Sequence, residues 1–270
     1  MMPVESIGQE IDREAKLFFE QHKPPTDLIF DDGAEMESNR HRIAMNALIR
    51  STLQALSNRS DFFAGGNMFV YYSRVQRMNR DFRGPDFFVT LNVDGSKERQ
   101  GWVVWEEEGR YPDVIVELLS PSTAAIDKGE KKDLYEQTFR TADYFIFDPF
   151  NPDSLCGWHL INRRYQALQP NAQGWLWCES LGLWLGTWQG TIDRETPTGN
   201  CHWLRFYDRN GNLVPLPEEA AQQQAEIAQQ QAEIAQQQAE IAQQQAEVAQ
   251  QRADRLAERL RALGENPDDL

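Results

Sequence analysis

Hydrophobic and polar positions recur with two different periods along the chain, which predicts both helices and strands. Between 36 and 56, apolar side chains recur three and four positions apart, which indicates an amphipathic helix with Ser38 or Asn39 as its N-cap. A second helix is expected at about 127–139, followed by a short strand at 144–148. Before it, runs rich in β-branched and aromatic residues predict strands at 67–75, 87–91, 102–105 and 114–119.

Beyond residue 148, strands and turns are expected to continue to about 217. Pairs such as 156–161 and 165–168 resemble hairpins. The Trp-rich run at 175–188 is expected to supply core and sheet-covering side chains rather than a platform on which bases stack. This order of elements predicts an α/β or α+β domain whose mixed sheet is flanked by helices.

The pattern changes at Pro217, after which a seven-residue unit, AQQQAEI, repeats about four times. Two alanine series with a spacing of seven, offset by three, continue into leucines and form a coiled-coil pattern. A long C-terminal helix of about 45 residues, roughly 65 Å in length, is expected. Self-association as a dimer or a higher coiled coil is the expected role. A solitary helix is the alternative, because contacts between alanines bury little surface.

These patterns divide the chain into an N-terminal extension at 1–34, a folded domain at 35–217, a helical coiled-coil tail at 218–265 and a disordered end at 266–270. The hydrophobic fraction of 40% is typical of a folded protein. No apolar stretch is long enough to span a membrane, and the acidic N-terminal residues predict no signal peptide. Three cysteines without a CxxC motif predict neither disulfides nor a zinc site, and they favour a cytoplasmic location.

The formal charge of −15 argues against a general nucleic-acid-binding protein, because such proteins bind phosphates through Lys and Arg. From Glu218 onward, 11 acids and 4 arginines contribute −7, and the first 217 residues contribute −8. A nucleic-acid substrate would therefore need a local basic patch or metal ions that bridge to phosphate.

Two acids occupy positions that could bind a divalent cation. Asp86 follows a Gly-Pro pair directly before a predicted strand, and Glu117 lies inside a later apolar strand. A carboxylate buried in a strand is costly unless it is paired or binds metal, although a single Glu can equally face solvent. Asp113 competes with Asp86, but it lies about 13 Å from Glu117 along one strand, too far to share a metal ion. Asp86 is therefore favoured.

The stretch YPDVIVELLSPSTAAIDKGEKKDLYEQTFRTADYFIFDP is similar to the signature of the Uma-two family of restriction-endonuclease-like proteins, a branch of the PD-(D/E)XK nuclease superfamily. MESNRH, NMFVYYS, RGPDFFV, LGLWLG and LRFYDRNGNLV extend the resemblance over most of residues 25–216. It implies a restriction-endonuclease-like fold and an endonuclease that cleaves DNA with Mg²⁺ (or Mn²⁺). In that interpretation, Asp86 and Glu117 are the metal ligands.

The superfamily pattern usually places a lysine two residues after the second acid, where this chain has Leu119. The resemblance implies that a lysine of the following helix serves instead, with Lys131 as the first choice and Lys132 as the second. Their alternative role is a solvated basic face. Glu37 matches a frequent extra acid and is a candidate ligand of a second metal ion, or equally a capping or surface acid. His41 is expected to be structural.

The sequence thus predicts a metal-dependent endonuclease in which Lys131 orients or activates the attacking water, and whose tail assembles copies of the chain. The alternative is a catalytically silent binding or scaffold protein that keeps the nuclease fold and acts through its coiled coil. The acidic charge and the departure at Leu119 favour the second hypothesis. The retention of Asp86, Glu117 and a nearby lysine favours the first.

Overall fold

The structure of the protein is a computed structural model that describes residues 28–30, 38–73, 82–121 and 123–263. Its contacts divide the chain into two units, residues 1–216 and 217–270. Most of the predicted N-terminal extension at 1–34 and the predicted end at 266–270 lie outside the described residues. No helix among the described residues is both long enough and apolar enough to cross a membrane.

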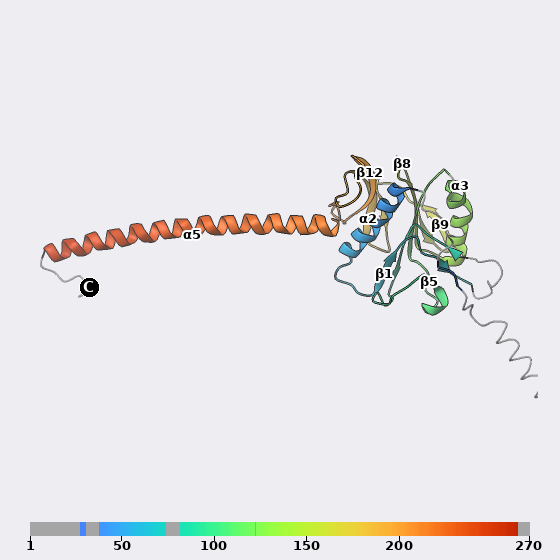
Figure 1. Ribbon diagram of the computed structural model, residues 1–270, viewed down its shortest axis with the longest axis horizontal. Coiled ribbons are helices and arrows are strands. Elements are labelled where there is room, and N and C mark those ends of the chain that lie inside the picture. The colour runs from blue at the N-terminus through green and yellow to red at the C-terminus, as the bar shows by residue number, and fades with distance from the viewer. Residues whose placement is uncertain (1–27, 31–37, 74–81, 122, 264–270) are drawn as a thin grey trace, which may run out of the picture. The chain divides into compact units, whose positions relative to one another are not determined.

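Six strands form the central sheet of the first unit, in the order β1-β4-β6-β7-β8-β9 (Figure 1). Strands β6 and β7 are parallel, and every other neighbouring pair is antiparallel. The mixed sheet predicted from the sequence is therefore confirmed. The strands are Phe62–Gly65 (β1), Phe87–Leu91 (β4), Val114–Leu118 (β6), Asp143–Asp148 (β7), Asn151–Ile161 (β8) and Arg164–Ala167 (β9).

Two three-stranded sheets complete the first unit. The Trp-rich run contributes to an antiparallel sheet of β10 (Leu176–Cys178), β11 (Leu183–Gly190) and β12 (Cys201–Tyr207). The other sheet contains β3 (Phe82–Arg83), β2 (Val70–Tyr71) and β5 (Trp102–Val103), in that order. The strand expected at 67–75 is thus only two residues long, and the one expected at 102–105 turns into a 3₁₀ helix, η1 (Val104–Glu106).

Strands β4, β6 and β7 of the central sheet are buried on both faces, because consecutive strand residues point to opposite sides and each side is covered there. Phe87 and Val116 face a core that includes residues of helix α2 (Asn39–Ala55) and of β10–β12. Phe88 and Ile115 face a second core that includes Tyr135 from the helical segment between β6 and β7. Figure 1 shows α2 and α3 on opposite sides of the sheet.

Helix α2 begins and ends close to its predicted bounds. Ser38 is its N-cap, with extended backbone and a side chain that accepts a hydrogen bond from the His41 N–H at 3.3 Å. Leu48 and Thr52 of the predicted apolar stripe are buried. Leu53 of the same stripe is 48% exposed, so the buried face of the helix is narrower than the pattern predicted.

The segment between β6 and β7 is helical from Ala124 to Phe139, three residues longer at its start than predicted. It consists of α3 (Ala124–Ile126), η2 (Asp127–Lys131), α4 (Lys132–Leu134) and η3 (Tyr135–Phe139). The η2 and η3 turns are π-helical, a conformation that is rare and is often found at functional sites. Arg140, in the left-handed conformation with φ of 55°, ends the helix.

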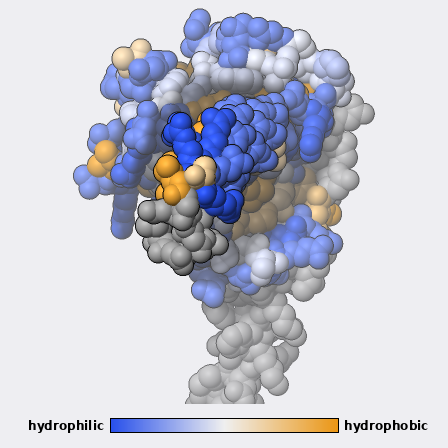
Figure 2. Space-filling view, turned by 90° about the vertical axis from the view of Figure 1, so that its left-hand side faces the viewer, coloured by the Kyte–Doolittle hydropathy of each residue, from blue (hydrophilic) through white to orange (hydrophobic). Residues whose placement is uncertain are grey.

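The second unit contains α5 (Pro217–Ala262), a helix of 46 residues, which confirms the predicted long C-terminal helix. None of its residues is buried. Side-chain hydrogen bonds between residues one helical turn apart support the helix, such as the bond from Gln229 to Glu233 at 3.1 Å, and they recur every seven residues. The isoleucine and valine of each repeat remain about half exposed, for example Ile234 at 55%. In Figure 2, the residues nearest the viewer are mainly hydrophilic with a few hydrophobic ones among them, and a broader hydrophobic area is partly visible behind them.

Candidate active site

Asp86 and Glu117 lie opposite each other on two neighbouring antiparallel strands. The register of β4 and β6 pairs Phe87 with Val116, and continuing it by one residue places Asp86 across from Glu117. Side chains in such positions have Cβ atoms about 5 Å apart and point to the same face. That face also carries Phe88 and Ile115, so both acids point toward the helical segment Ala124–Phe139.

The backbone holds Asp86 in place. Its Oδ2 accepts a hydrogen bond from the N–H of Leu118 at 2.7 Å, at the end of β6. Asp113 makes the same contact at the other end of the strand pair, where its Oδ2 accepts from the N–H of Leu91 at 2.7 Å. The two aspartates therefore cap opposite ends of one strand pair, and Asp86 is the one at the end that carries Glu117.

Both oxygens of Glu117 contact side chains of the helical segment. The Tyr135 hydroxyl donates to Oε1 at 2.7 Å, and the Lys131 ammonium lies 3.0 Å from Oε2. The Glu117 side chain has no exposed surface, and that of Lys131 is 16% exposed. A carboxylate removed from water needs partners of this kind, since its burial is otherwise costly.

Asp127 is a third acid at this place, and it was not identified from the sequence. Its Oδ1 lies 2.8 Å from the Lys131 ammonium, and its side chain is 1% exposed. Among the residues that the structure describes, Oδ2 has no hydrogen-bond partner. The spacing of four between Asp127 and Lys131 was the available signal. It was weak, because acid and lysine pairs at this spacing are common on exposed helix faces.

The pKa values of these groups follow from burial and from one another's charge. Burial raises the pKa of Asp86 well above its usual range, and the neighbouring charge of Glu117 raises it further. Burial also raises the pKa of Glu117, against the opposing effect of Lys131. For Lys131, burial alone would lower the pKa. The charges of Glu117 and Asp127 outweigh it, so the pKa is raised and Lys131 is an ammonium at neutral pH.

This donor set fits a divalent cation. Asp86, Glu117, Asp127 and Lys131 form a chain of contacts whose formal charges sum to −2, which one divalent cation would neutralise. Two carboxylates side by side are the oxygen ligands that Mg²⁺ accepts, with water or substrate phosphate filling its other positions. Within the described ranges, no group of three or more His, Cys, Asp or Glu side chains is arranged to hold a metal ion, so the protein would supply only these two carboxylates.

The other predicted site residues lie elsewhere. The Lys132 ammonium lies 4.6 Å from the ring centroid of Trp158, and no ion pair joins it to either strand acid among the described residues. His41 Nε2 lies 3.3 Å from the carbonyl oxygen of Leu119, in the backbone just beyond β6. Leu119 itself is buried in the core on the Glu117 face. Glu37 lies outside the described residues.

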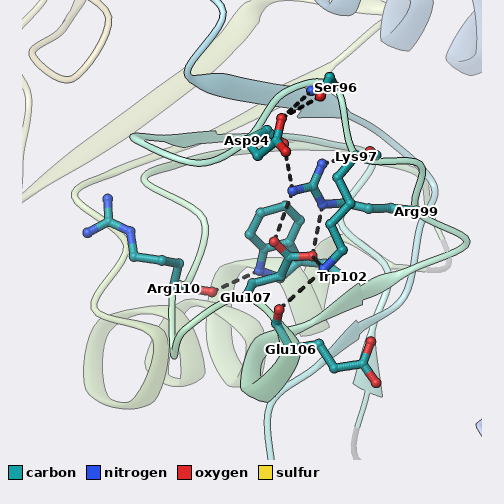
Figure 3. A network of polar contacts seen from close by, with 8 residues as sticks. All are labelled: Asp94, Ser96, Lys97, Arg99, Trp102, Glu106, Glu107 and Arg110. Carbon is teal, nitrogen blue, oxygen red and sulfur yellow. Dashed lines mark hydrogen bonds and ion pairs between the residues drawn. The ribbon is translucent and has the colours of Figure 1, made fainter.

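A cavity of about 630 Å³ lies at the opposite end of β4 from Asp86. Its lining includes Lys97, Arg99 and Glu107, whose charges are paired with one another (Figure 3). The Arg99 guanidinium, 1% exposed, contacts both Glu107 oxygens and two backbone carbonyls. We regard this network as structural, because its buried groups are already satisfied by one another.

The family model of Uma2, described as "Putative restriction endonuclease", matches residues 29–192, which is more than half of the chain. No curated protein matches the chain. Among solved structures, the protein is similar to one described as a putative nuclease belonging to DUF820 from Anabaena variabilis ATCC 29413. The two are 14% identical with a TM-score of 0.40, and the match covers 58% of this chain and 86% of the other. That likeness is low, so the assignment rests on the family match. The chain belongs to the Uma2 family.

Proposed function

We propose that the protein is a metal-dependent endonuclease that hydrolyses phosphodiester bonds in DNA, with Mg²⁺ or Mn²⁺ as its cofactor. One observation carries this proposal: the fully buried carboxylate of Glu117 lies across from the partly buried carboxylate of Asp86 on the neighbouring strand, with the ammonium of Lys131 against Glu117. Burial of such a cluster is costly, and a folded protein keeps it only where the charges have a use or are well paired. Membership of the Uma2 family supports the nuclease class.

Each residue has a distinct part in the proposed chemistry. Asp86 and Glu117 would hold the divalent cation, which supplies Lewis acidity and lowers the pKa of water when it is bound. Tyr135, through its hydroxyl, fixes the orientation of Glu117. Lys131 is already protonated, so it cannot accept a proton from water. It can donate a hydrogen bond to the attacking water or to a phosphate oxygen and so stabilise the charge that develops there.

The acidic composition is compatible with a DNA substrate if the cation is bound first. With Asp86, Glu117 and Asp127 all ionised and Lys131 protonated, the site carries a formal charge of −2, which would repel a phosphodiester. With a divalent cation held by Asp86 and Glu117, the cluster would carry no net charge, and Lys131 would direct its positive charge at the substrate without a net negative background. DNA binding should therefore depend on the metal ion at this site, and not on a large basic surface.

The proposal is tested by plasmid cleavage with purified protein and Mg²⁺ or Mn²⁺, comparing Asp86→Asn with Asp113→Asn. Both aspartates precede a strand and accept one backbone N–H at 2.7 Å, so the two substitutions disturb the fold to a similar degree. Only Asp86 lies beside Glu117. Loss of cleavage confined to Asp86→Asn supports the site, and equal activity in both variants would exclude it.

A silent scaffold protein is the second candidate function. It is favoured by Leu119, which fills with an apolar side chain the position where the superfamily usually has lysine. It is also favoured by the ion pairs of Lys131, because these satisfy Glu117 and Asp127 in part without any metal ion. This candidate predicts a folded protein whose stability does not respond to Mg²⁺ or Mn²⁺.

We also propose that the tail assembles copies of the chain. Along α5, Ile227, Ile234, Ile241 and Val248 are each about half exposed at intervals of seven residues. A second helix could cover this stripe together with the adjacent alanines. Pairing through the tails would bring two nuclease units into one particle and could present two sites to the two strands of DNA.

A further inference from the structure

Asp127 is a buried acid to which the proposed chemistry gives no task. It lies in the π-helical turn η2, with a side chain that is 1% exposed. Its Oδ1 forms an ion pair with the Lys131 ammonium at 2.8 Å, and neither of its two oxygens has a hydrogen-bond partner of normal geometry among the described residues. A buried carboxylate with an unsatisfied oxygen is costly, so its presence at the site needs an explanation.

The contacts of Lys131 suggest one. Its ammonium lies between two acids, 3.0 Å from Glu117 Oε2 and 2.8 Å from Asp127 Oδ1. Glu117 is also a proposed ligand of the divalent cation. A cation bound there would repel an ammonium in contact with the same carboxylate, and the repulsion would be strong because the site is buried. Lys131 must then leave Glu117, and Asp127 is the acid next to it.

We propose that Asp127 is a positioning residue that takes over the Lys131 ammonium when a divalent cation binds to Asp86 and Glu117. This inference rests on the proposed function only for the cation site. Lysine has three N–H donors, and Oδ2 of Asp127 offers a second acceptor beside Oδ1. Asp127 and Lys131 are one helical turn apart, so side-chain rotation alone achieves the shift.

The coupling has a definite sign. With Asp127 present, the lysine has a second buried acid to move to, and Glu117 is released for the cation. Without the Asp127 charge, Glu117 is the one acid left in an ion pair with the ammonium among the described residues, so Lys131 competes with the metal ion for it. Asp127 therefore raises the affinity for the cation, and it does so through Lys131. Two residues that act through each other in this way have non-additive effects.

The test is calorimetric titration of the full-length protein with Mn²⁺ in a double-mutant cycle of Asp127→Asn and Lys131→Met. We expect Asp127→Asn alone to weaken Mn²⁺ affinity about tenfold, and Lys131→Met alone to strengthen it. With Lys131→Met already present, Asp127→Asn should change the affinity by less than about twofold. Asp133→Asn, an exposed acid on the same helical segment, serves as the control and should leave the affinity unchanged.

The outcomes separate this inference from the proposed function. If Asp127→Asn weakens Mn²⁺ binding equally with Lys131 and with Met at position 131, Asp127 acts directly on the cation. The positioning role is then wrong while the cation site stands. If neither the wild type nor Lys131→Met binds Mn²⁺, both proposals are wrong. If Asp127→Asn does not fold, as judged by circular dichroism, the inference is tested by Lys131→Met alone. A Lys131→Met protein that binds Mn²⁺ no more tightly than the wild type would overturn it.

Discussion

The two oxygens of Glu117 have partners of different kinds. Oε2 faces the charge of Lys131, and Oε1 accepts the hydroxyl hydrogen of Tyr135 at 2.7 Å. Hydrogen bonds to a carboxylate are shorter and stronger than those between neutral groups. Removing the donor also leaves a buried oxygen without a partner. Tyr135 is therefore expected to stabilise the fold through its hydroxyl more than the other buried tyrosines do.

Tyr135→Phe should lower the free energy of unfolding by about 2 kcal/mol, because the carboxylate oxygen of Glu117 loses its donor in a buried place. The matched control is Tyr165→Phe, since the Tyr165 hydroxyl donates to a neutral acceptor, the carbonyl of Thr141, at 3.0 Å. That change should cost about 1 kcal/mol. Urea unfolding of the three proteins measures both values, and a Tyr135→Phe protein as stable as Tyr165→Phe would contradict the interpretation.

At the scale of elements, the loop between β4 and β5 is tied to the turn after η1 by one buried ion-pair network. Glu107 accepts from Lys97 at 2.7 Å and from Arg99 at 2.9 and 3.0 Å (Figure 3). Arg99 also stacks against Phe63 and Trp102, each about 5.0 Å from the guanidinium carbon. Burial would raise the pKa of Glu107, but its hydrogen bonds with Arg99 and Lys97 outweigh burial and lower it.

Glu107→Gln should therefore destabilise the protein in a pH-dependent way. At pH 7 the cost is about 3 kcal/mol, because Arg99 is left buried without its counter-charge. A lowered pKa in the folded state gives stability above the usual Glu pKa of about 4.3, and this stability is lost as the pH falls through the lowered value. Unfolding at pH 7 and near pH 3 should show the difference from wild type shrinking in acid. Glu106→Gln, an exposed neighbour, should show no such trend.

The sequence predicts a strand well when the strand's own apolar residues stabilise it, and poorly when pairing with a neighbouring strand does. The strand at 87–91 was predicted with its observed bounds, and the one at 114–119 within one residue, because continuous apolar runs mark strands buried on both faces. β1 (Phe62–Gly65) was not predicted. It has four residues and two glycines near its end, and pairing with β4 defines it rather than its own pattern.

The residues of the candidate site also differ in how well the sequence predicts them. The proximity of Asp86 and Glu117 follows from strand register, which the positions of the two strands already suggested. The choice between Lys131 and Lys132 depended on the rotation of a helix that has π-helical turns, and no periodic pattern predicts such turns. The sequence did not reveal Asp127, because this residue is buried by tertiary contacts. Its side chain is covered only when the helical segment packs on β6 and β7.

At the scale of the whole molecule, the chain combines a nuclease-family unit with a helix that buries none of its own residues. Intrahelical Gln–Glu hydrogen bonds and good helix formers support α5, but isolated helices in water gain only small increments from such contacts. The half-exposed stripe of Ile227 and its equivalents is what a second copy would cover.

Full-length protein should therefore have the mass of a dimer or a larger assembly, and a truncation after Leu216 should have the mass of a monomer. Light scattering with size-exclusion chromatography measures both. Replacing Ile227, Ile234 and Ile241 by Gln in the full-length chain keeps a helix-forming residue at each position and removes the stripe, so it should also give a monomer. A full-length protein that is monomeric at every concentration would contradict tail assembly.

The central claim is that Asp86 and Glu117 form the metal site of a DNA endonuclease, and plasmid cleavage by Asp86→Asn and Asp113→Asn tests it most directly. Wild-type protein and Asp113→Asn should nick supercoiled plasmid at similar rates with Mg²⁺ and not with EDTA. Asp86→Asn should be slower by about 10²-fold or more. Cleavage by Asp86→Asn at the rate of Asp113→Asn, or cleavage that continues in EDTA, would contradict the account.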